Sequence, residues 1–364
     1  MPRQRYTASM KACEQIYLCD PAWQQALLNE LAATQSAMQH TLLQPGWVGS
    51  RATSATATAL PQTCLAFSQQ LLPTPVPLQE PSISRWAATL ADLLRETLGL
   101  QCGAWRLHLV ALPAPGASLT PGRARLIEAA LDDILHKKLR ALRRARTDSL
   151  SAHWHSDEAL VQLILHTRTE AVFSCCLPST RGALHNLISP FPAGLVDIPV
   201  DKAPPARAYR KLLEAQLHLG CHISKGEHVV DLGAAPGSWT HLALSRGARV
   251  TAVDRSPLRA DLMAHPGTSF IQGDGFAYEP TAPVDWLLCD IISAPQRSRE
   301  LLLHWLDRGL CRHLVTTLKF SGSQQYHIVQ TLCSDLERRG SQHLLRHLSA
   351  NHNEVTVMAH SAQA

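Results

Sequence analysis

Apolar runs and helical stretches alternate regularly in the second half of the chain. From residue 197 onward, amphipathic segments separate short apolar runs that have the length of buried strands. The first five runs end at Asp231, Asp254, Gly273, Asp290 and Lys319. Two more runs, 342–348 and 354–358, follow one another closely. The pattern predicts a doubly wound, mostly parallel sheet of seven strands, with one antiparallel strand at or near its edge.

The elements of the first half follow one another less regularly. Residues 15–68 are typical of a small α/β unit with a helix over 22–33 and strands at 16–19, 47–49 and 64–67. Residues 51–59 are expected to form a loop, and the proline-rich segment 73–81 a linker. In the next segment we expect helices over 84–98 and 122–146 and strands over 105–110, 160–165 and 171–177. The predicted domains are 1–80, 81–196 and 197–364.

The segment Val229–Thr240 predicts a strand that ends in a tight turn and opens a helix. Gly233 and Gly237 allow the backbone to turn sharply and to approach a ligand closely. Asp254 ends the next predicted strand, 21 residues after Gly233, where a carboxylate can accept hydrogen bonds from a ribose diol. The chain is therefore expected to hold a nucleoside cofactor at the end of the sheet.

The turn favours S-adenosylmethionine over NAD as that cofactor. The dinucleotide fingerprint G-x-G-x-x-G clears space for a pyrophosphate, but here the middle glycine is missing. S-adenosylmethionine has no pyrophosphate and does not need that glycine. A dehydrogenase remains the rival that calorimetry with NAD would test.

Four further polar residues lie where a buried catalytic cluster could form. They are Lys211, Asp290, Lys319 and Glu354. A lysine at the end of a strand, or a glutamate before one, is ordinarily a solvated residue. A set of two lysines and two carboxylates around one cofactor site favours a catalytic role instead.

With these residues the chain resembles the FtsJ/RrmJ-like ribose 2'-O-methyltransferases of RNA, and among them the bacterial RlmM family, which modifies a cytidine of 23S ribosomal RNA. The resemblance extends over about residues 197–364. Its motifs are Asp231–Thr240, Asp254, Gly273–Gly275, Cys289–Asp290, Leu318–Lys319 and Asn353–Val357. It implies a Rossmann-like class I methyltransferase domain, preceded by an α+β ferredoxin-like domain and a THUMP-like RNA-binding domain.

The resemblance also implies roles for individual residues. Lys319 would be the general base of a Lys-Asp-Lys-Glu tetrad that Lys211, Asp290 and Glu354 complete. The S-adenosylmethionine site would comprise Gly233, Ala235, Pro236, Gly237, Ser238, Trp239, Asp254, Asp274 and Asp290. Ala208 stands where the RlmM pattern has a serine that contacts the donor, so one hydroxyl contact is lost.

Methyl transfer from a sulfonium requires alignment and removal of a proton, and no metal or covalent nucleophile. Lysine is a poor base at its ordinary pKa of about 10.4. Burial and a neighbouring cation disfavour the charged form of an amine. We therefore expect Lys211 to depress the pKa of Lys319 and make it competent near neutral pH.

Composition and charge add the expected partners. The 364 residues carry a formal net charge of +5, which permits a polyanionic partner. The basic run Lys137–Arg146 is either a solvated helix face or a surface that contacts RNA, namely 23S ribosomal RNA or its precursor particle. No apolar run reaches transmembrane length, and no metal site is expected because the cysteines are scattered and the histidines show no ligand spacing. Isolated cysteines favour a cytoplasmic protein.

Several alternatives stay open at this point. Another RNA, a protein or a small molecule could be the methyl acceptor, although neither of the last two needs a pair of lysines. A binding module with an inactive catalytic domain would be expected to lack one of the four charged residues. The oligomeric state, monomer or homodimer, does not follow from the sequence.

Overall fold

The computed structural model describes residues 10, 12–53, 65–99, 103–147, 155, 157–184 and 186–361. The chain divides into two compact units, an N-terminal unit Met1–Leu195 and a C-terminal unit Val196–Ala364. Among the described residues, no helix has both the length and the apolar character needed to cross a membrane. The domain boundary at residue 80 and the THUMP assignment stay predictions.

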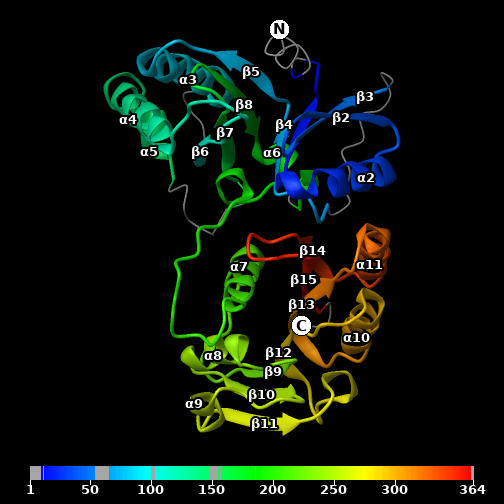
Figure 1. The fold of residues 1–364 in the computed structure, drawn as a ribbon. Coiled ribbons are helices and arrows are strands. Elements are labelled where there is room, and N and C mark those ends of the chain that lie inside the picture. Colours follow the sequence, from blue (N-terminus) through cyan, green and yellow to red (C-terminus); the bar gives the residue numbers. More distant parts are fainter. Residues whose placement is uncertain are drawn as a thin grey trace. The chain divides into compact units, whose positions relative to one another are not determined.

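The N-terminal unit contains two four-stranded sheets (Figure 1). The first is antiparallel, in the order β2-β3-β1-β4. Its strands are β1 (Gln15–Leu18), β2 (Met38–Gln44), β3 (Trp47–Ala52) and β4 (Gln70–Pro73). Between β1 and β2, the chain forms η1 (Pro21–Trp23) and α2 (Gln24–Thr34), which buries Leu27 and Leu31.

The second sheet of this unit has the order β5-β8-β7-β6, in which only β6 and β7 are parallel neighbours. Its strands are β5 (Val76–Gln79), β6 (Trp105–Ala111), β7 (Ala159–Leu165) and β8 (Glu170–Cys176). The helical segments are α3 (Ile83–Leu98), α4 (Pro121–Lys138), α5 (Arg140–Ala145), α6 (Pro178–Leu184) and η2 (Pro192–Gly194). Apolar side chains of α3 and α4 form one core with β7, including Trp86, Ile127 and Leu163.

Two predictions for residues 64–81 of this unit are wrong. Residues 73–81 are not a linker, because they contain the end of β4 and the edge strand β5, and an edge strand tolerates a proline such as Pro77. The predicted strand 64–67 is a turn in its described part. The Glu30 carboxylate accepts hydrogen bonds from the backbone N–H groups of Ala66 and Phe67 (2.9 and 3.1 Å), so these groups are not available to a neighbouring strand. Cys64, and residues 54–59 of the predicted loop, lie outside the described residues.

The predicted helix over 122–146 is broken into α4 and α5. Leu139 leaves helical geometry, with φ −131° and ψ 52°. The Trp105 indole N–H donates to the Leu142 carbonyl at 2.9 Å, which fixes α5 against β6. The periodicity of apolar residues continues across the break, so the sequence pattern gives no sign of it.

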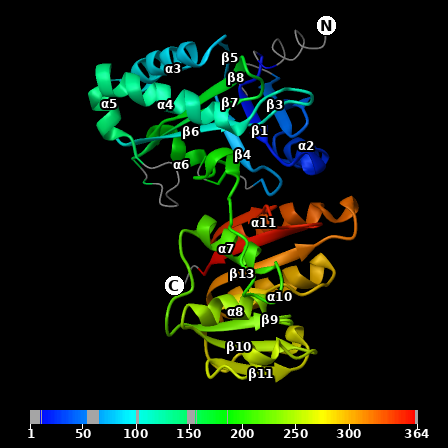
Figure 2. The same cartoon turned by 60° about the vertical axis from the view of Figure 1, so that its left-hand side comes forward.

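The C-terminal unit is built on one seven-stranded sheet in the order β11-β10-β9-β12-β13-β15-β14 (Figure 2). Its strands are β9 (His228–Leu232), β10 (Arg249–Asp254), β11 (Thr268–Gln272), β12 (Val284–Cys289), β13 (Cys311–Lys319), β14 (Gln342–Arg346) and β15 (Glu354–His360). Of these seven strands, β15 alone runs in the direction opposite to the other six. The prediction of a mostly parallel, Rossmann-like sheet with one antiparallel strand near its edge is confirmed.

Helices cover both faces of this sheet, with α7 and α8 on one side and α10 and α11 on the other (Figure 1). The helical segments are α7 (Tyr209–Leu219), α8 (Ser238–Ser245), α9 (Ala260–Met263), η3 (Gly275–Ala277), α10 (Pro295–Asp307), η4 (Ser323–Gln325) and α11 (His327–Arg338). Leu212 of α7 and Trp239 of α8 share a core with Val229, Val315 and Met358 of the sheet. The strand order reverses between β9 and β12, and ligands bind such sheets beyond the carboxyl ends of the strands at this point.

Candidate functional site

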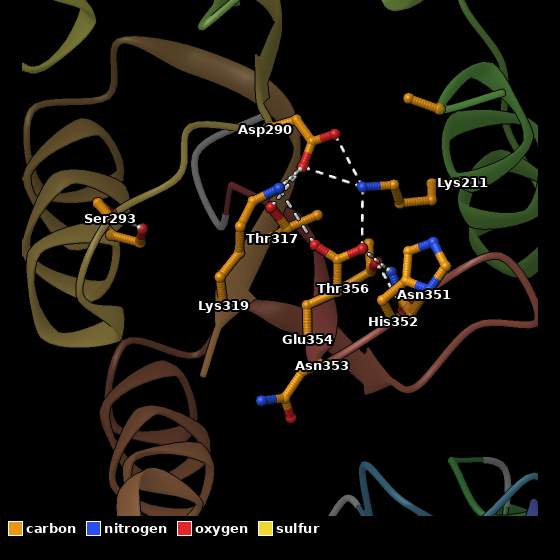
Figure 3. A network of polar contacts seen from close by, with 12 residues as sticks. Lys211, Asp290, Ser293, Thr317, Lys319, Asn351, His352, Asn353, Glu354 and Thr356 are labelled. Carbon is orange, nitrogen blue, oxygen red and sulfur yellow. Dashed lines mark hydrogen bonds and ion pairs between the residues drawn. The ribbon is translucent and has the colours of Figure 1, made fainter. Parts of the chain in front are cut away.

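Two lysines and two carboxylates from four different elements converge beside the carboxyl ends of β12 and β13 (Figure 3). Lys211 lies in the first turn of α7, and Asp290 directly follows β12. Lys319 is the last residue of β13 and Glu354 is the first residue of β15. Because these two strands are antiparallel, Lys319 and Glu354 are direct partners in the ladder.

The four side chains form a closed ring of alternating charge, which we call the tetrad. Lys211 Nζ lies 2.8 Å from Asp290 Oδ2 and 2.9 Å from Glu354 Oε1. Lys319 Nζ lies 2.7 Å from Asp290 Oδ1 and 3.2 Å from Glu354 Oε2. Each amine therefore contacts both carboxylates, and the ring has no net charge when all four groups are ionised.

The tetrad is buried unevenly. The side chains of Lys211 and Glu354 are 8% and 5% exposed, whereas Asp290 is 16% and Lys319 is 21% exposed. Lys319 is thus the amine that a substrate reaches most easily. Lys211 is enclosed between its two carboxylates and is placed to act on them rather than on a substrate.

The electrostatics of the tetrad correct one prediction. Burial lowers the pKa of Lys319, but Asp290 and Glu354 outweigh burial and the pKa is raised above its ordinary value. Burial raises the pKa of Glu354, yet Lys211 and Lys319 outweigh it and the net shift is downward. The expectation of a depressed pKa for Lys319 is therefore wrong for the tetrad as it stands, because two carboxylates contact Lys319 directly.

Uncharged side chains fix the two carboxylates. The Thr317 hydroxyl donates to Asp290 Oδ1 at 2.8 Å. The Asn351 amide donates to Glu354 Oε1 at 3.2 Å, and its own oxygen accepts from the Thr356 hydroxyl at 3.1 Å. Sequence reasoning missed these three residues, because their role becomes visible only when β13 and β15 are paired.

The predicted turn follows β9 and is tightly packed. Gly233 and Gly237 both have left-handed backbone conformations, with φ of 76° and 109°. A Cβ atom at Gly233 would lie 2.6 Å from the Ile291 side chain, so only glycine fits there. The Asp290 N–H donates to the Leu232 carbonyl at 3.3 Å, which joins the turn directly to the tetrad.

Two carboxylates predicted to bind the cofactor lie at neighbouring strand ends. Asp254 ends β10, and its two oxygens accept hydrogen bonds from the Ala235 N–H (3.0 Å) and the Ser256 N–H (2.8 Å). Asp274 follows β11, accepts from the Phe276 N–H at 3.0 Å and pairs with Arg255 at 3.1 Å. The hydrogen bond from Phe276 is the largest cause that lowers the pKa of Asp274, and the nearby arginines lower it further.

Ser238 and Trp239 contact the chain that precedes α7. The Ser238 hydroxyl donates to the Ala206 carbonyl at 3.0 Å and accepts from the Ala206 N–H at 2.9 Å. The Trp239 indole N–H donates to the Ala208 carbonyl at 2.8 Å. Both polar groups therefore hold residues 206–208 beside the turn, and a direct contact of either with a cofactor stays a prediction.

Asp231 is a buried acid that the sequence placed in the motif but not in the site. It is 1% exposed, and Thr240 donates to it at 2.6 Å. Burial raises its pKa to about 7, with further upward contributions from Asp290 and Asp254. The signal that could have marked it is the single acid in an otherwise apolar strand.

Comparison with known proteins agrees with this geometry. Residues 205–360 match the family model of the FtsJ-like methyltransferases. The chain is 34% identical over 182 residues to Ribosomal RNA large subunit methyltransferase M of Azoarcus sp., covering 48% of this chain and 49% of that protein. The protein of the same name from Marinobacter nauticus is 33% identical over 236 residues, covering 61% and 62%. That from Cellvibrio japonicus is 37% identical over 151 residues, covering 40% and 43%. The chain spans about half the length of most curated relatives it matches.

Proposed function

Because residues 205–360 match the family model of the FtsJ-like methyltransferases, we propose that the chain transfers a methyl group from S-adenosylmethionine to a ribose 2'-hydroxyl of RNA. The curated relatives are named as methyltransferases of the large-subunit ribosomal RNA, so the proposed substrate is ribosomal RNA. The resemblance to the RlmM family adds a cytidine of 23S ribosomal RNA as the proposed target. The observation that carries the proposal is the tetrad, in which both lysines contact both carboxylates next to the turn.

The turn and its neighbouring carboxylates fit a nucleoside donor. Each oxygen of Asp254 accepts one backbone N–H and keeps a lone pair, so the carboxylate can still accept from a ribose diol. Gly233 and Gly237 bring the backbone close to this position without side chains in between. Gly233, Ala235, Pro236, Gly237, Asp254 and Asp274 would hold S-adenosylmethionine. When bound, the donor supplies a methyl group already activated by its sulfonium.

Lys319 would take the proton from the 2'-hydroxyl. It is the more exposed lysine, and it stands at the end of β13 where a ribose can reach it. Its raised pKa favours the ammonium form, so a productive encounter requires that this proton leave first. Lys319 would lose its proton more readily beside a bound cation, because like charge disfavours the ammonium.

The other three members of the tetrad would position Lys319. Asp290 and Glu354 hold its amine from two sides, and Lys211 contacts both carboxylates and favours the ionised form of the buried Glu354. Alignment of this kind can supply several kcal/mol of a barrier. Thr317 and Asn351 would keep the carboxylates in register through their hydrogen bonds.

The N-terminal unit would add electrostatic affinity for RNA. In the basic run Lys137–Arg146, Arg143 pairs with Asp132 (3.3 Å) and Arg146 pairs with Glu128, so these two cations are partly neutralised. Arg140 and Arg144 line the same hollow, together with His136. RNA carries the 2'-hydroxyl that the proposed reaction needs, and its backbone is a regular array of phosphates. We assign contact with these phosphates to Arg140 and Arg144.

The experiment is methyl transfer from labelled S-adenosylmethionine to unmodified 23S ribosomal RNA transcribed in vitro. Nuclease digestion and mass spectrometry then identify the methylated nucleoside, with 2'-O-methylcytidine as the expected product. Bovine serum albumin and a DNA copy of the same sequence are the control acceptors. A methyl group on a base, or equal labelling of the DNA copy, would contradict the proposal.

A further inference from the structure

A second cluster of side chains with metal-binding chemistry lies in the C-terminal unit, apart from the tetrad. Cys221, His313 and His360 each offer one ligand atom, and these atoms lie within 4.8 Å of one another. All three side chains are half-buried. Their positions in the sequence are far apart, so no spacing motif indicates them.

The strand register brings the two imidazoles together. His313 near the start of β13 and His360 at the end of β15 are direct partners in the antiparallel ladder. Direct partners have Cβ atoms about 4.5–5.5 Å apart and point to one face of the sheet. Their Nδ1 atoms lie 2.6 Å apart, a distance at which one ring donates a proton that the other accepts. A metal ion can replace that shared proton.

Cys221 reaches the same place from a third element. Gly220 ends α7 in the left-handed conformation, with φ 68°. The next residue, Cys221, packs against the core that contains Val315 of β13 and Met358 of β15. The Trp286 ring lies against the His313 ring, with centroids 4.6 Å apart, and limits its movement.

This donor set has the chemistry of a zinc site. Zn²⁺ binds imidazole nitrogen at about 2.0–2.1 Å and thiolate sulfur at about 2.3 Å in a tetrahedron. These lengths place ligand atoms roughly 3.3–3.6 Å apart. That separation is larger than the 2.6 Å between the two Nδ1 atoms and smaller than 4.8 Å, the limit within which the three ligand atoms lie. Small side-chain rotations therefore suffice to bring the three atoms to the distances that Zn²⁺ requires.

We propose that Cys221, His313 and His360 bind Zn²⁺, with water as the fourth ligand, and that the ion has a structural role. On binding, the Cys221 thiol releases its proton to solvent. The ring that holds the shared proton gives it up from Nδ1 to solvent and takes up a proton on Nε2, so that the Nδ1 lone pairs of both imidazoles coordinate the ion. Two opposite charges lie near His313: Arg312, and Asp285, whose carboxylate accepts from the His228 N–H at 2.9 Å and lies 3.7 Å from Arg312.

The structural role follows from where the three ligands lie along their elements. His313 and Lys319 are six residues apart on β13, and His360 and Glu354 are six residues apart on β15. An even spacing puts each pair on one face of the sheet, about 20 Å apart. Cys221 follows α7, which carries Lys211. The ion would therefore tie together the far ends of the three elements that hold three of the four tetrad residues.

The test uses the full chain without an affinity tag, Zn²⁺ as the titrant in calorimetry, and Co²⁺ as a spectroscopic substitute. We expect one high-affinity Zn²⁺ per chain, and with Co²⁺ a thiolate-to-metal absorption band. Zn²⁺ at a hundredfold excess over its Kd should raise the Tm of the C-terminal unit by roughly 5–10 °C.

Two variants and two matched controls decide the outcome. Cys221→Ser and His360→Gln should each weaken Zn²⁺ binding by roughly tenfold or more, and Cys221→Ser should also remove the thiolate band. His343→Gln on β14 and Cys175→Ser in the N-terminal unit should bind as the wild type does. The Tm of each variant without metal shows that it is folded. No Zn²⁺ binding by the wild type, or equal binding by the cluster variants and the controls, would overturn the proposal.

Discussion

Replacing Glu354 with glutamine removes one of the two carboxylates that hold Lys319 while keeping the shape of the side chain. Glu354 lies 3.2 Å from Lys319 Nζ and 2.9 Å from Lys211 Nζ. After the substitution, Asp290 alone remains between two ammonium groups, and the tetrad carries a net positive charge. We therefore expect the ammonium form of Lys319 to be less stable and its neutral amine to form at lower pH.

The size of this effect follows from the distance. Two unit charges 3.2 Å apart interact by about 5 kcal/mol at an effective dielectric constant of 20, and by about 1 kcal/mol in bulk water. Lys319 is 21% exposed, so the interaction energy that its ammonium loses in Glu354→Gln lies between these limits. Each 1.4 kcal/mol multiplies the neutral fraction of an amine about tenfold. The buried Lys211 also loses one of its two carboxylate partners and keeps Asp290 at 2.8 Å, so the loss of stability is smaller than the about 3–5 kcal/mol that a fully unpaired buried charge costs.

The assay is the single-turnover rate of methyl transfer to RNA, measured from neutral to alkaline pH. In the wild type, the rate should rise with pH as Lys319 loses its proton. In Glu354→Gln, this rise should occur at lower pH, and the Tm should fall. Glu337→Gln, on the exposed side of α11, is the matched control and should change neither quantity. A rise at the same pH in the variant and the wild type would refute the role given to Lys319 ionisation.

Three further predictions concern the turn, the buried acid and the RNA surface. Gly233→Ala places a Cβ 2.6 Å from a neighbouring side chain at φ 76°, and should lower the free energy of unfolding in urea by about 2–4 kcal/mol. Gly226→Ala, at φ 87° with no atom within 4 Å, should lower it by about 1–2 kcal/mol. Equal losses in the two variants would contradict the packing of the turn. The pKa of Asp231 is raised from 3.8 to about 7, so its contribution to stability is present below pH 3.8 and is lost as the pH rises through 7. Asp231→Asn should remove this part of the pH dependence of the unfolding free energy in chemical denaturation. An unchanged profile would show that the acid does not titrate in this range. Arg140→Glu combined with Arg144→Glu should weaken RNA binding in fluorescence anisotropy and reduce its salt dependence with donor affinity unchanged, whereas unaltered RNA affinity would assign both residues to an ordinary surface.

The C-terminal sheet was predictable because its strands are buried on both faces. Such strands read as nearly continuous apolar runs, and the polar residue that ends each run marks the edge where ligands bind. Asp231, Asp254 and Lys319 carried that signal. The structure places the turn, Asp254 and the tetrad along this edge. The roles of the individual residues remain predictions.

Features that depend on pairing between distant segments were not predictable. The His313–His360 contact exists only because β13 and β15 are antiparallel in one register, and nothing in the spacing of the histidines indicates it. The same register sets Glu354 against Lys319. The pKa of Lys319 is therefore raised, whereas the sequence led us to expect a lowered pKa. Pro77 lies in an edge strand, although prolines in the sequence favoured a linker.

The most direct test of the account measures donor binding and methyl transfer side by side in Lys319→Ala. The Lys319 amine contacts the carboxylates of Asp290 and Glu354, which lie outside the turn. We predict that calorimetry gives wild-type affinity for S-adenosylmethionine, while the labelled methyl group is no longer transferred to 23S ribosomal RNA. Turnover near that of the wild type would contradict the assignment of Lys319 as the base, and with it the catalytic role of the tetrad.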